Sequence, residues 1–282
     1  MDKENALSSI AAVKNFLEES STLWNQYDYH PMPGSQAEKE LSEFPRSESI
    51  GTAYSQGGIL IEVAADFTYA VTKTLTEPAE TIAPWACARG VLETSAISMW
   101  ILDTDINAHE RVKRSYAFRY EGLDQQKKFA QATRGKVNPQ TIIQRINEVE
   151  QIGLELGFNK VVNKKGKRTG LGQEMPAITE IVIKMLNKEL DYRLLLGMVH
   201  AHPWALQNFG FIKAKDNQKI FTNVTGAYFE KHLTFDSIFF LCTNCVNSLF
   251  QALLMKFNLF GWETKPLAIL ASEAIKTIQP PK

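Results

Sequence analysis

Apolar residues recur at helical spacing along most of this 282-residue chain, and prolines and glycines mark the places where the pattern is interrupted. Spacings of three and four residues place apolar side chains on one face of a helix. Two such stretches stand next to each other, from Gly57 to Leu75 and from Pro84 to Asp103. The pattern predicts an all-α, up-down bundle of about seven or eight helices, joined mostly by short loops.

The other segments fit this class. Further helices are predicted at residues 4–27, 107–136, 139–156, 177–202, 232–262 and 264–278. A small β-hairpin is expected near 211–224, with Asp216 and Asn217 between its arms. Residues 30–50 are rich in proline and serine and predict an extended connector. We therefore divide the chain into an N-terminal helix with its connector, residues 1–50, and a helical bundle domain, residues 51–282.

Composition and cysteine content narrow the class of protein. An apolar fraction of 44% is too high for intrinsic disorder, and three cysteines are too few for a secreted disulfide scaffold. The first twenty residues hold four acids and no apolar signal core, so we expect a cytoplasmic protein. Residues 238–260 are long enough to cross a membrane, but they include several polar side chains and predict a buried core helix instead.

Charge is balanced in total but uneven along the chain, with 31 Lys and Arg against 31 Asp and Glu. Residues 1–80 hold 5 basic and 13 acidic side chains, a net charge of −8, whereas residues 111–168 hold 14 basic and 5 acidic, a net charge of +9. A total of zero argues against a protein whose whole surface coats nucleic acid or membrane. The two blocks either occupy different faces or pair with each other, and we favour pairing.

One face of the predicted helix at 177–202 carries an arginine and a histidine. Arg193 and His200 are two turns apart, about 10.5 Å along the axis, and project the same way. Leucine, methionine and valine surround them, so we expect this helix to be largely buried. A buried guanidinium needs a partner, because an isolated buried charge is strongly unfavourable.

The predicted helix that follows Pro84 offers such a partner. Arg89 and Glu93 lie one turn apart on it, and Glu93 can pair with Arg89 locally or reach Arg193 on the other helix. Two interpretations stay open. The residues form either a polar cluster that fixes the register of the helices, or a cleft or dimer seam in which Arg193 and His200 act on a phosphate.

The spacing of Arg193 and His200, late in a long apolar helix, resembles the motif of the HEPN superfamily of prokaryotic defence and toxin proteins. The segments ARGVLETSAISMWILD and YRLLLGMVHAHPWAL also resemble uncharacterised bacterial HEPN-like helical proteins, over residues 55–260. The resemblance implies a homodimeric, metal-independent endoribonuclease that acts as an effector or toxin in antiviral defence. His200 would transfer protons while the RNA 2′-hydroxyl attacks the adjacent phosphate, and Arg193 would stabilise the charge on the phosphoryl oxygens.

Leu194 departs from the family pattern, because active members usually have a polar residue directly after the arginine. A non-catalytic interaction or regulatory module, in which the same residues are structural, is therefore the alternative hypothesis. A protein partner or antitoxin is compatible with either hypothesis.

Basic residues ahead of the motif helix are candidate RNA contacts. Segment 159–174 has several glycine and asparagine residues, which predict a loop. It carries the cations Lys164, Lys165, Lys167 and Arg168, which could reach phosphates, although such loops are more often only solvated. Cations and aromatic residues also alternate over residues 111–120, but aromatic residues on a helix usually belong to the core.

The sequence predicts no metal ion or cofactor. Cys242 and Cys245 have C-x-x-C spacing, but they stand within an apolar helical run and are interpreted as small core residues. Glu62 and Asp66 are one turn apart without a matching Glu-x-x-His segment, and we expect them either to cap a helix or to pair with Arg89 or another cation. No P-loop, dinucleotide fingerprint or nucleophile elbow is present.

Overall fold

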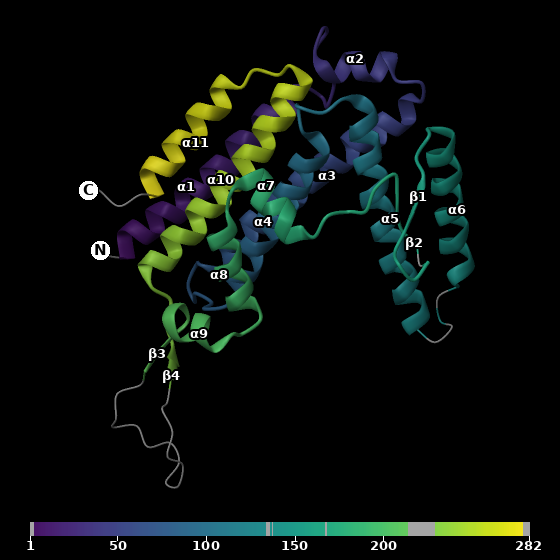
Figure 1. Cartoon of the computed structure of the whole chain (residues 1–282). Coiled ribbons are helices and arrows are strands. Elements are labelled where there is room, and N and C mark those ends of the chain that lie inside the picture. Colours follow the sequence, from purple (N-terminus) through teal and green to yellow (C-terminus); the bar gives the residue numbers. More distant parts are fainter. Residues whose placement is uncertain (1–2, 134–135, 137, 167, 214–228, 279–282) are drawn as a thin grey trace.

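A computed structural model of the chain describes residues 3–133, 136, 138–166, 168–213 and 229–278. Within them, eleven helices and four short strands follow one another (Figure 1). The helices are α1 (Lys3–Asn25), α2 (Gln36–Glu43), α3 (Ser47–Thr74), α4 (Ala83–Leu102), α5 (Ala108–Ala132), α6 (Pro139–Glu155), α7 (Ile178–Leu186), α8 (Glu189–Val199), α9 (Pro203–Phe209), α10 (Phe235–Phe260) and α11 (Lys265–Ile278). The strands are β1 (Lys160–Val162), β2 (Arg168–Leu171), β3 (Phe211–Lys213) and β4 (Phe229–Lys231). The predicted all-α multi-helix bundle with a small hairpin is confirmed.

Helices α3 and α4 form an antiparallel pair in the middle of the molecule (Figure 1). Glycines bring them together. A Cβ atom on Gly57 would lie 2.4 Å from Cγ of Leu102, and one on Gly90 would lie 2.7 Å from the ring of Phe67. The hydroxyl of Ser98 donates to the carbonyl of Gly57 at 2.8 Å. Because Gly57 faces the end of α4 and Gly90 faces the later part of α3, the two helices run in opposite directions.

Helix α10 is the core helix predicted at 232–262. It is long and apolar enough to cross a membrane by length and composition, but 61% of its most apolar window is buried inside the molecule. It packs against α1, α3, α4 and α11. Cys242 and Cys245 lie on it, both fully buried, and burial raises the pKa of Cys242 to about 12. The prediction that the two cysteines are core residues is confirmed.

The prediction of an extended connector at residues 30–50 is wrong. Helix α2 lies within it and begins where the Ser35 hydroxyl accepts a hydrogen bond from the backbone N–H of Glu38, a local N-cap that the proline-rich composition concealed. Helix α3 begins at Ser47 and runs through position 50. Helix α1 packs against α10 and α11, and its buried residues belong to the same hydrophobic core as theirs.

The single long helix predicted at 177–202 is also wrong, because the chain breaks between α7 and α8. Asn187 ends α7 with a φ of 53°, in the left-handed region that asparagine tolerates better than most residues. Helix α8 ends in a Schellman motif. There the N–H of His202 donates to the carbonyl of Gly197 at 2.9 Å, and the N–H of Ala201 donates to that of Met198 at 3.1 Å.

Both hairpins differ from the sequence expectations. Strands β3 and β4 pair antiparallel, so the second arm falls at 229–231 and not before 224, and the predicted turn at 216–217 lies outside the described residues. Segment 159–174, predicted as a loop, contains the antiparallel hairpin β1–β2. Val161 and Val162 favour a strand, and β2 packs against α5.

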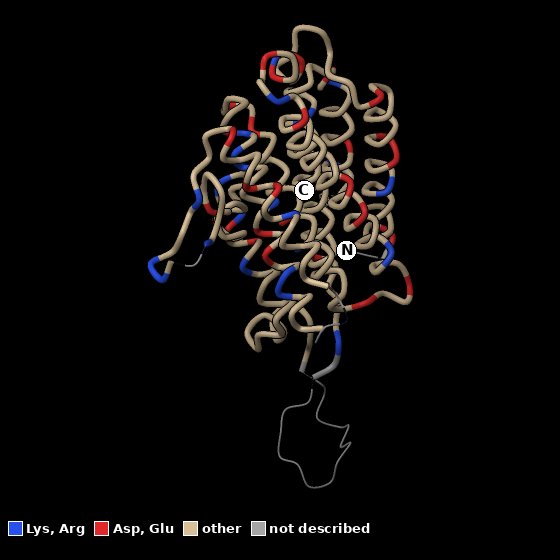
Figure 2. The backbone as a smooth tube through the Cα atoms, turned by 90° about the vertical axis from the view of Figure 1, so that its right-hand side faces the viewer, with Lys and Arg blue, Asp and Glu red and all other residues tan. Residues whose placement is uncertain are grey.

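The acidic and basic blocks of the sequence pair with each other in part. Arg111 of the basic block contacts Glu40 of the acidic block at 2.8 Å, whereas the pair between Arg46 and Glu155, at 2.6 Å, joins the two blocks with the charges reversed. Figure 2 shows basic and acidic positions interspersed along the helices on the side that it displays. The expected pairing of the two blocks is present at Arg111 and Glu40, whereas Lys160 and Arg168 of the basic block pair with Glu150 of the same block.

Candidate functional site

Helices α4 and α8 pack against each other and bring three of the candidate residues and a tyrosine together. Arg89 and Glu93, one turn apart on α4, form an ion pair with 2.7 Å between Nε and Oε1. Tyr192 of α8 donates its hydroxyl to the same Oε1 at 2.7 Å. Nη1 of Arg89 lies 3.4 Å from Nε2 of His200, so the guanidinium connects the carboxylate to the imidazole.

Glu93 is the electrostatic centre of this cluster. Burial alone lowers the pKa of Arg89, but hydrogen bonding to and attraction by the Glu93 carboxylate outweigh it, and the net shift is upward. Burial and the same carboxylate raise the pKa of the Tyr192 phenol. Arg89 therefore keeps its charge and Tyr192 its proton, and both hold Glu93 in one orientation.

His200 stands at the C-cap of α8 and is exposed to solvent. A guanidinium N–H can only donate, so its contact with Nε2 fits the imidazole tautomer that carries its proton on Nδ1. Ala201 follows in the left-handed conformation, with a φ of 53°, which turns the chain sharply after the histidine. The ring of His202 lies edge-on to that of His200, with 6.2 Å between centroids.

Arg193 lies on the same helix but outside this cluster. Its side chain is 60% exposed, and its Nε and Nη2 both donate to Oε1 of Glu189, one turn earlier, at 2.9 and 2.7 Å. Glu93 pairs with Arg89 and not with Arg193. The expectation that Arg193 and His200 lie on a buried face is wrong. The break at Asn187 turns α8 so that Tyr192, Leu195 and Met198 face the core instead.

Two apolar side chains flank Arg193 and His200 on the surface. Leu190 is 82% exposed and Trp204 is 50% exposed. The indole of Trp204 lies against Gly197, where a Cβ atom would come within 2.6 Å of it. We call the surface formed by Leu190, Arg193, His200 and Trp204 the α8 face. It combines exposed cationic and imidazole groups with apolar contact area.

The predicted RNA-binding residues lie elsewhere. Lys164 and Lys165 are exposed at the turn of β1–β2, and Lys167 lies outside the described residues. Arg168 is largely buried, pairs with Glu150 and stacks over the ring of Tyr120 with 4.7 Å from Cζ to the centroid. The hairpin packs on α5, whereas α8 packs on α4, so the structure does not bring these cations to the α8 face (Figure 1).

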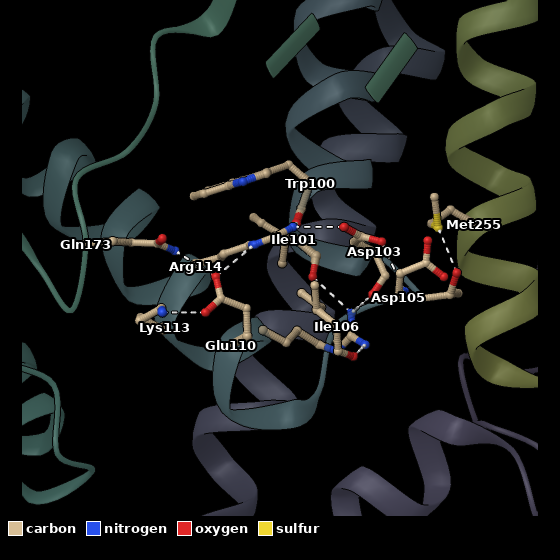
Figure 3. A network of polar contacts seen from close by, with 12 residues as sticks. Trp100, Ile101, Asp103, Asp105, Ile106, Glu110, Lys113, Arg114, Gln173 and Met255 are labelled. Atoms are coloured by element: carbon tan, nitrogen blue, oxygen red, sulfur yellow. Dashed lines mark hydrogen bonds and ion pairs between the residues drawn. The ribbon is translucent and has the colours of Figure 1, made fainter. Parts of the chain in front are cut away.

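Two arginines of the predicted basic helix, α5, have structural contacts in the interior. Arg114 donates to the carbonyl of Trp100 at 2.7 Å and to Asp103 and Glu110 at 3.1 and 3.2 Å (Figure 3). Arg111 is fully buried and donates to the carbonyls of residues 101 and 103 at 3.1 and 3.0 Å. These guanidinium groups satisfy carbonyls at the C-terminal end of α4, which have no partner within the helix.

The expected pairing of Glu62 and Asp66 with Arg89 is not observed, because Arg89 pairs with Glu93. Glu62 instead lines a cavity that it shares with Lys256 of α10. Sequence reasoning missed Tyr192 and Lys256. Tyr192 directly precedes Arg193, and it points at α4 because the break at Asn187 changes the direction of α8. Lys256 was visible only as one polar position within an apolar run.

Neither a protein-family model, nor a curated protein, nor a solved structure matches this chain in the comparisons made with known proteins. A functional hypothesis for it rests on its own residues and on the geometry given above.

Proposed function

We propose that this protein is a HEPN-like, metal-independent endoribonuclease of the cytoplasm that acts as a homodimer in bacterial defence, with the α8 face as its site. The observation that carries the proposal is the accessibility of Arg193 and His200 on one helix, with the Arg89 guanidinium 3.4 Å from the imidazole. Groups required only to hold helices in register would be expected in the interior.

The chemistry needs a base, an acid and cationic stabilisation. Nε2 of His200 takes the proton of the RNA 2′-hydroxyl as the hydroxyl oxygen bonds to the adjacent phosphorus, and this requires the Arg89 N–H that faces Nε2 to turn to the phosphate. The 5′-oxygen leaves with a proton supplied by a second acid. In a homodimer, that acid is His200 of the other copy. Arg89 and Arg193 are the guanidinium groups available to the phosphoryl oxygens.

The dimer part of the proposal is supported by the exposed apolar side chains of the α8 face. Leu190 and Trp204 flank the two charged groups and provide apolar area for a symmetric contact. Two copies joined here would place both Arg193/His200 pairs at one seam. Lys164 and Lys165, on the β1–β2 turn, would contact only a longer RNA that extends beyond the site.

The test is cleavage of structured and unstructured RNA by purified protein in the presence of EDTA. We expect cleavage that survives EDTA, falls by about 100-fold in His200→Ala and falls strongly in Arg193→Ala. The matched control is Lys276→Ala, an exposed cation on α11, which leaves the rate unchanged. Absence of cleavage, or a rate that His200→Ala does not alter, contradicts the proposal.

A second candidate is a non-catalytic RNA-binding or regulatory module with a protein partner or antitoxin. Two observations favour it: Leu194 stands where active HEPN proteins usually have a polar residue, and Glu189 already occupies the Arg193 guanidinium. This candidate predicts RNA or protein binding without cleavage. Binding that Arg193→Ala weakens, in a preparation that leaves the RNA intact, would support it over the nuclease.

A further inference from the structure

A lysine lies buried beside a cavity at the junction of α1, α3 and α10. Lys256 is 4% exposed, and its Nζ lies 3.5 Å from the centre of the Phe260 ring. The rings of Trp24, Tyr54 and Trp262 lie 5.6 to 6.0 Å from the same atom. Among the described residues, no carboxylate forms an ion pair with it and no acceptor forms a hydrogen bond with it.

The space next to this amine is open. The cavity has a volume of about 420 Å³, within the range of small-molecule sites. Gly58 of α3 lies beside the amine, and a Cβ atom there would be 3.9 Å from Nζ and 4.0 Å from the indole of Trp24. A larger side chain at this position would therefore fill part of the space that adjoins Nζ.

We propose that Lys256 is the reactive amine of a small-molecule site that binds a neutral aldehyde or ketone and condenses with its carbonyl to form an imine. The free electron pair of Nζ bonds to the carbonyl carbon as the C–O π bond breaks. Both amine protons pass to the oxygen, which leaves as water while the C–N double bond forms. No oxidant or reductant is consumed.

The surroundings favour a neutral carbonyl ligand over an anion. The polar groups that line the cavity beside the amine are Tyr54, Ser55 and Glu62 from α3 and Tyr29 and His30 from the chain after α1, and the other lining residues are apolar or aromatic. The carboxylate of Glu62 stands exposed at the cavity mouth, where it disfavours an anionic ligand and can exchange protons during the condensation. Burial lowers the pKa of Lys256 to about 7, although Glu62 opposes this, so much of the amine is unprotonated near neutral pH.

The test is reductive alkylation of the folded, full-length protein with benzaldehyde and cyanoborohydride at pH 7, followed by peptide mapping. We expect Lys256 to be alkylated at least about tenfold faster than an exposed lysine such as Lys276, because exposed lysines are protonated at this pH. Mapping separates this adduct from that of the N-terminal amine. Equal labelling of the two lysines overturns the proposal.

A second variant guards against labelling through local unfolding. Gly58→Leu adds a side chain next to Nζ and should reduce alkylation of Lys256 by about tenfold while Lys276 reacts as before. Lys256→Met should remove the fast-reacting site altogether. If Gly58→Leu is alkylated at Lys256 as fast as the wild type, the amine is not reached through the cavity and the proposal fails.

Discussion

Single residues decide how closely α3 and α4 approach. Gly57 meets the side chain of Leu102, which is fully buried and has no room to move away. Between α4 and α8, the hydroxyl of Tyr192 donates one hydrogen bond of 2.7 Å to the carboxylate of Glu93. Neither contact is visible in the periodicity of the sequence, because periodicity shows which face of a helix is buried and not which atoms meet across it.

Gly57→Ala should destabilise the protein by about 1 to 3 kcal/mol in urea denaturation, because the added methyl group overpacks the contact with Leu102. Gly122→Ala, on an exposed turn of α5 with nothing within 4 Å of the new atom, should stabilise it by about 0.5 to 1 kcal/mol. Stabilisation by both substitutions would show that α3 and α4 are farther apart than described.

Ala201→Gly should stabilise the protein by about 1 kcal/mol, because Ala201 holds a left-handed conformation that glycine adopts without strain. The measurement is the shift in the urea midpoint at constant slope. An unchanged or lowered midpoint would mean that the Schellman end of α8, which positions His200, is not formed in solution.

Lys256 gives a stability that depends on pH. Its pKa is lowered from 10.5 to about 7 in the folded state, so between these values the unfolded chain binds more protons than the folded chain. The free energy of unfolding is therefore lowest below pH 7 as far as Lys256 is concerned. Between pH 7 and pH 10 the effect of Lys256 raises it by roughly 1 kcal/mol per pH unit. Denaturation from pH 7 to 9 should show this slope in the wild type and a smaller one in Lys256→Met. Equal slopes would contradict the burial of the amine.

At the scale of elements, Arg111 and Arg114 of α5 hold the C-terminal end of α4 in place, and Figure 3 shows the contacts of Arg114. Arg111 also pairs with Glu40. Burial raises the pKa of Glu40, but the hydrogen bonds from Arg111, Tyr54 and Gln36 and the charge of Arg111 together outweigh burial, so the net shift of this pKa is downward. The amphipathic pattern of residues 107–136 predicted a helix correctly, but the sequence did not show that Arg111 and Arg114 point inward. A run of cations has the same sequence pattern whether its side chains contact the end of a neighbouring helix or point into solvent.

Arg111→Met should destabilise the protein by about 3 to 5 kcal/mol, because it leaves Glu40 and the carbonyls of α4 without their buried partner. Arg193→Met, on the exposed face of α8, should change stability by less than about 1 kcal/mol. Urea denaturation of the pair measures both. Similar losses of unfolding free energy in the two variants would contradict the assignment of Arg111 to the interior and of Arg193 to the surface.

At the scale of the whole molecule, the helical class and most helix positions were predictable, because apolar spacing and proline or glycine breaks are local signals. The break at Asn187, the N-cap at Ser35 and the β1–β2 hairpin were not predicted, since each depends on a few residues within a segment of different average composition. The error at Asn187 had the largest effect. Because of the break at Asn187, the helix face that we expected to be buried is exposed as the α8 face, and the proposed function depends on this exposure.

The central claim is that Arg193 and His200 serve a function and do not hold the fold together. The most direct test measures RNA cleavage and the free energy of unfolding on one preparation of His200→Ala. We predict that cleavage in EDTA falls by about 100-fold while the free energy of unfolding stays within about 0.5 kcal/mol of the wild type. Unchanged cleavage, or a loss of cleavage that follows a loss of several kcal/mol in stability, would contradict the account.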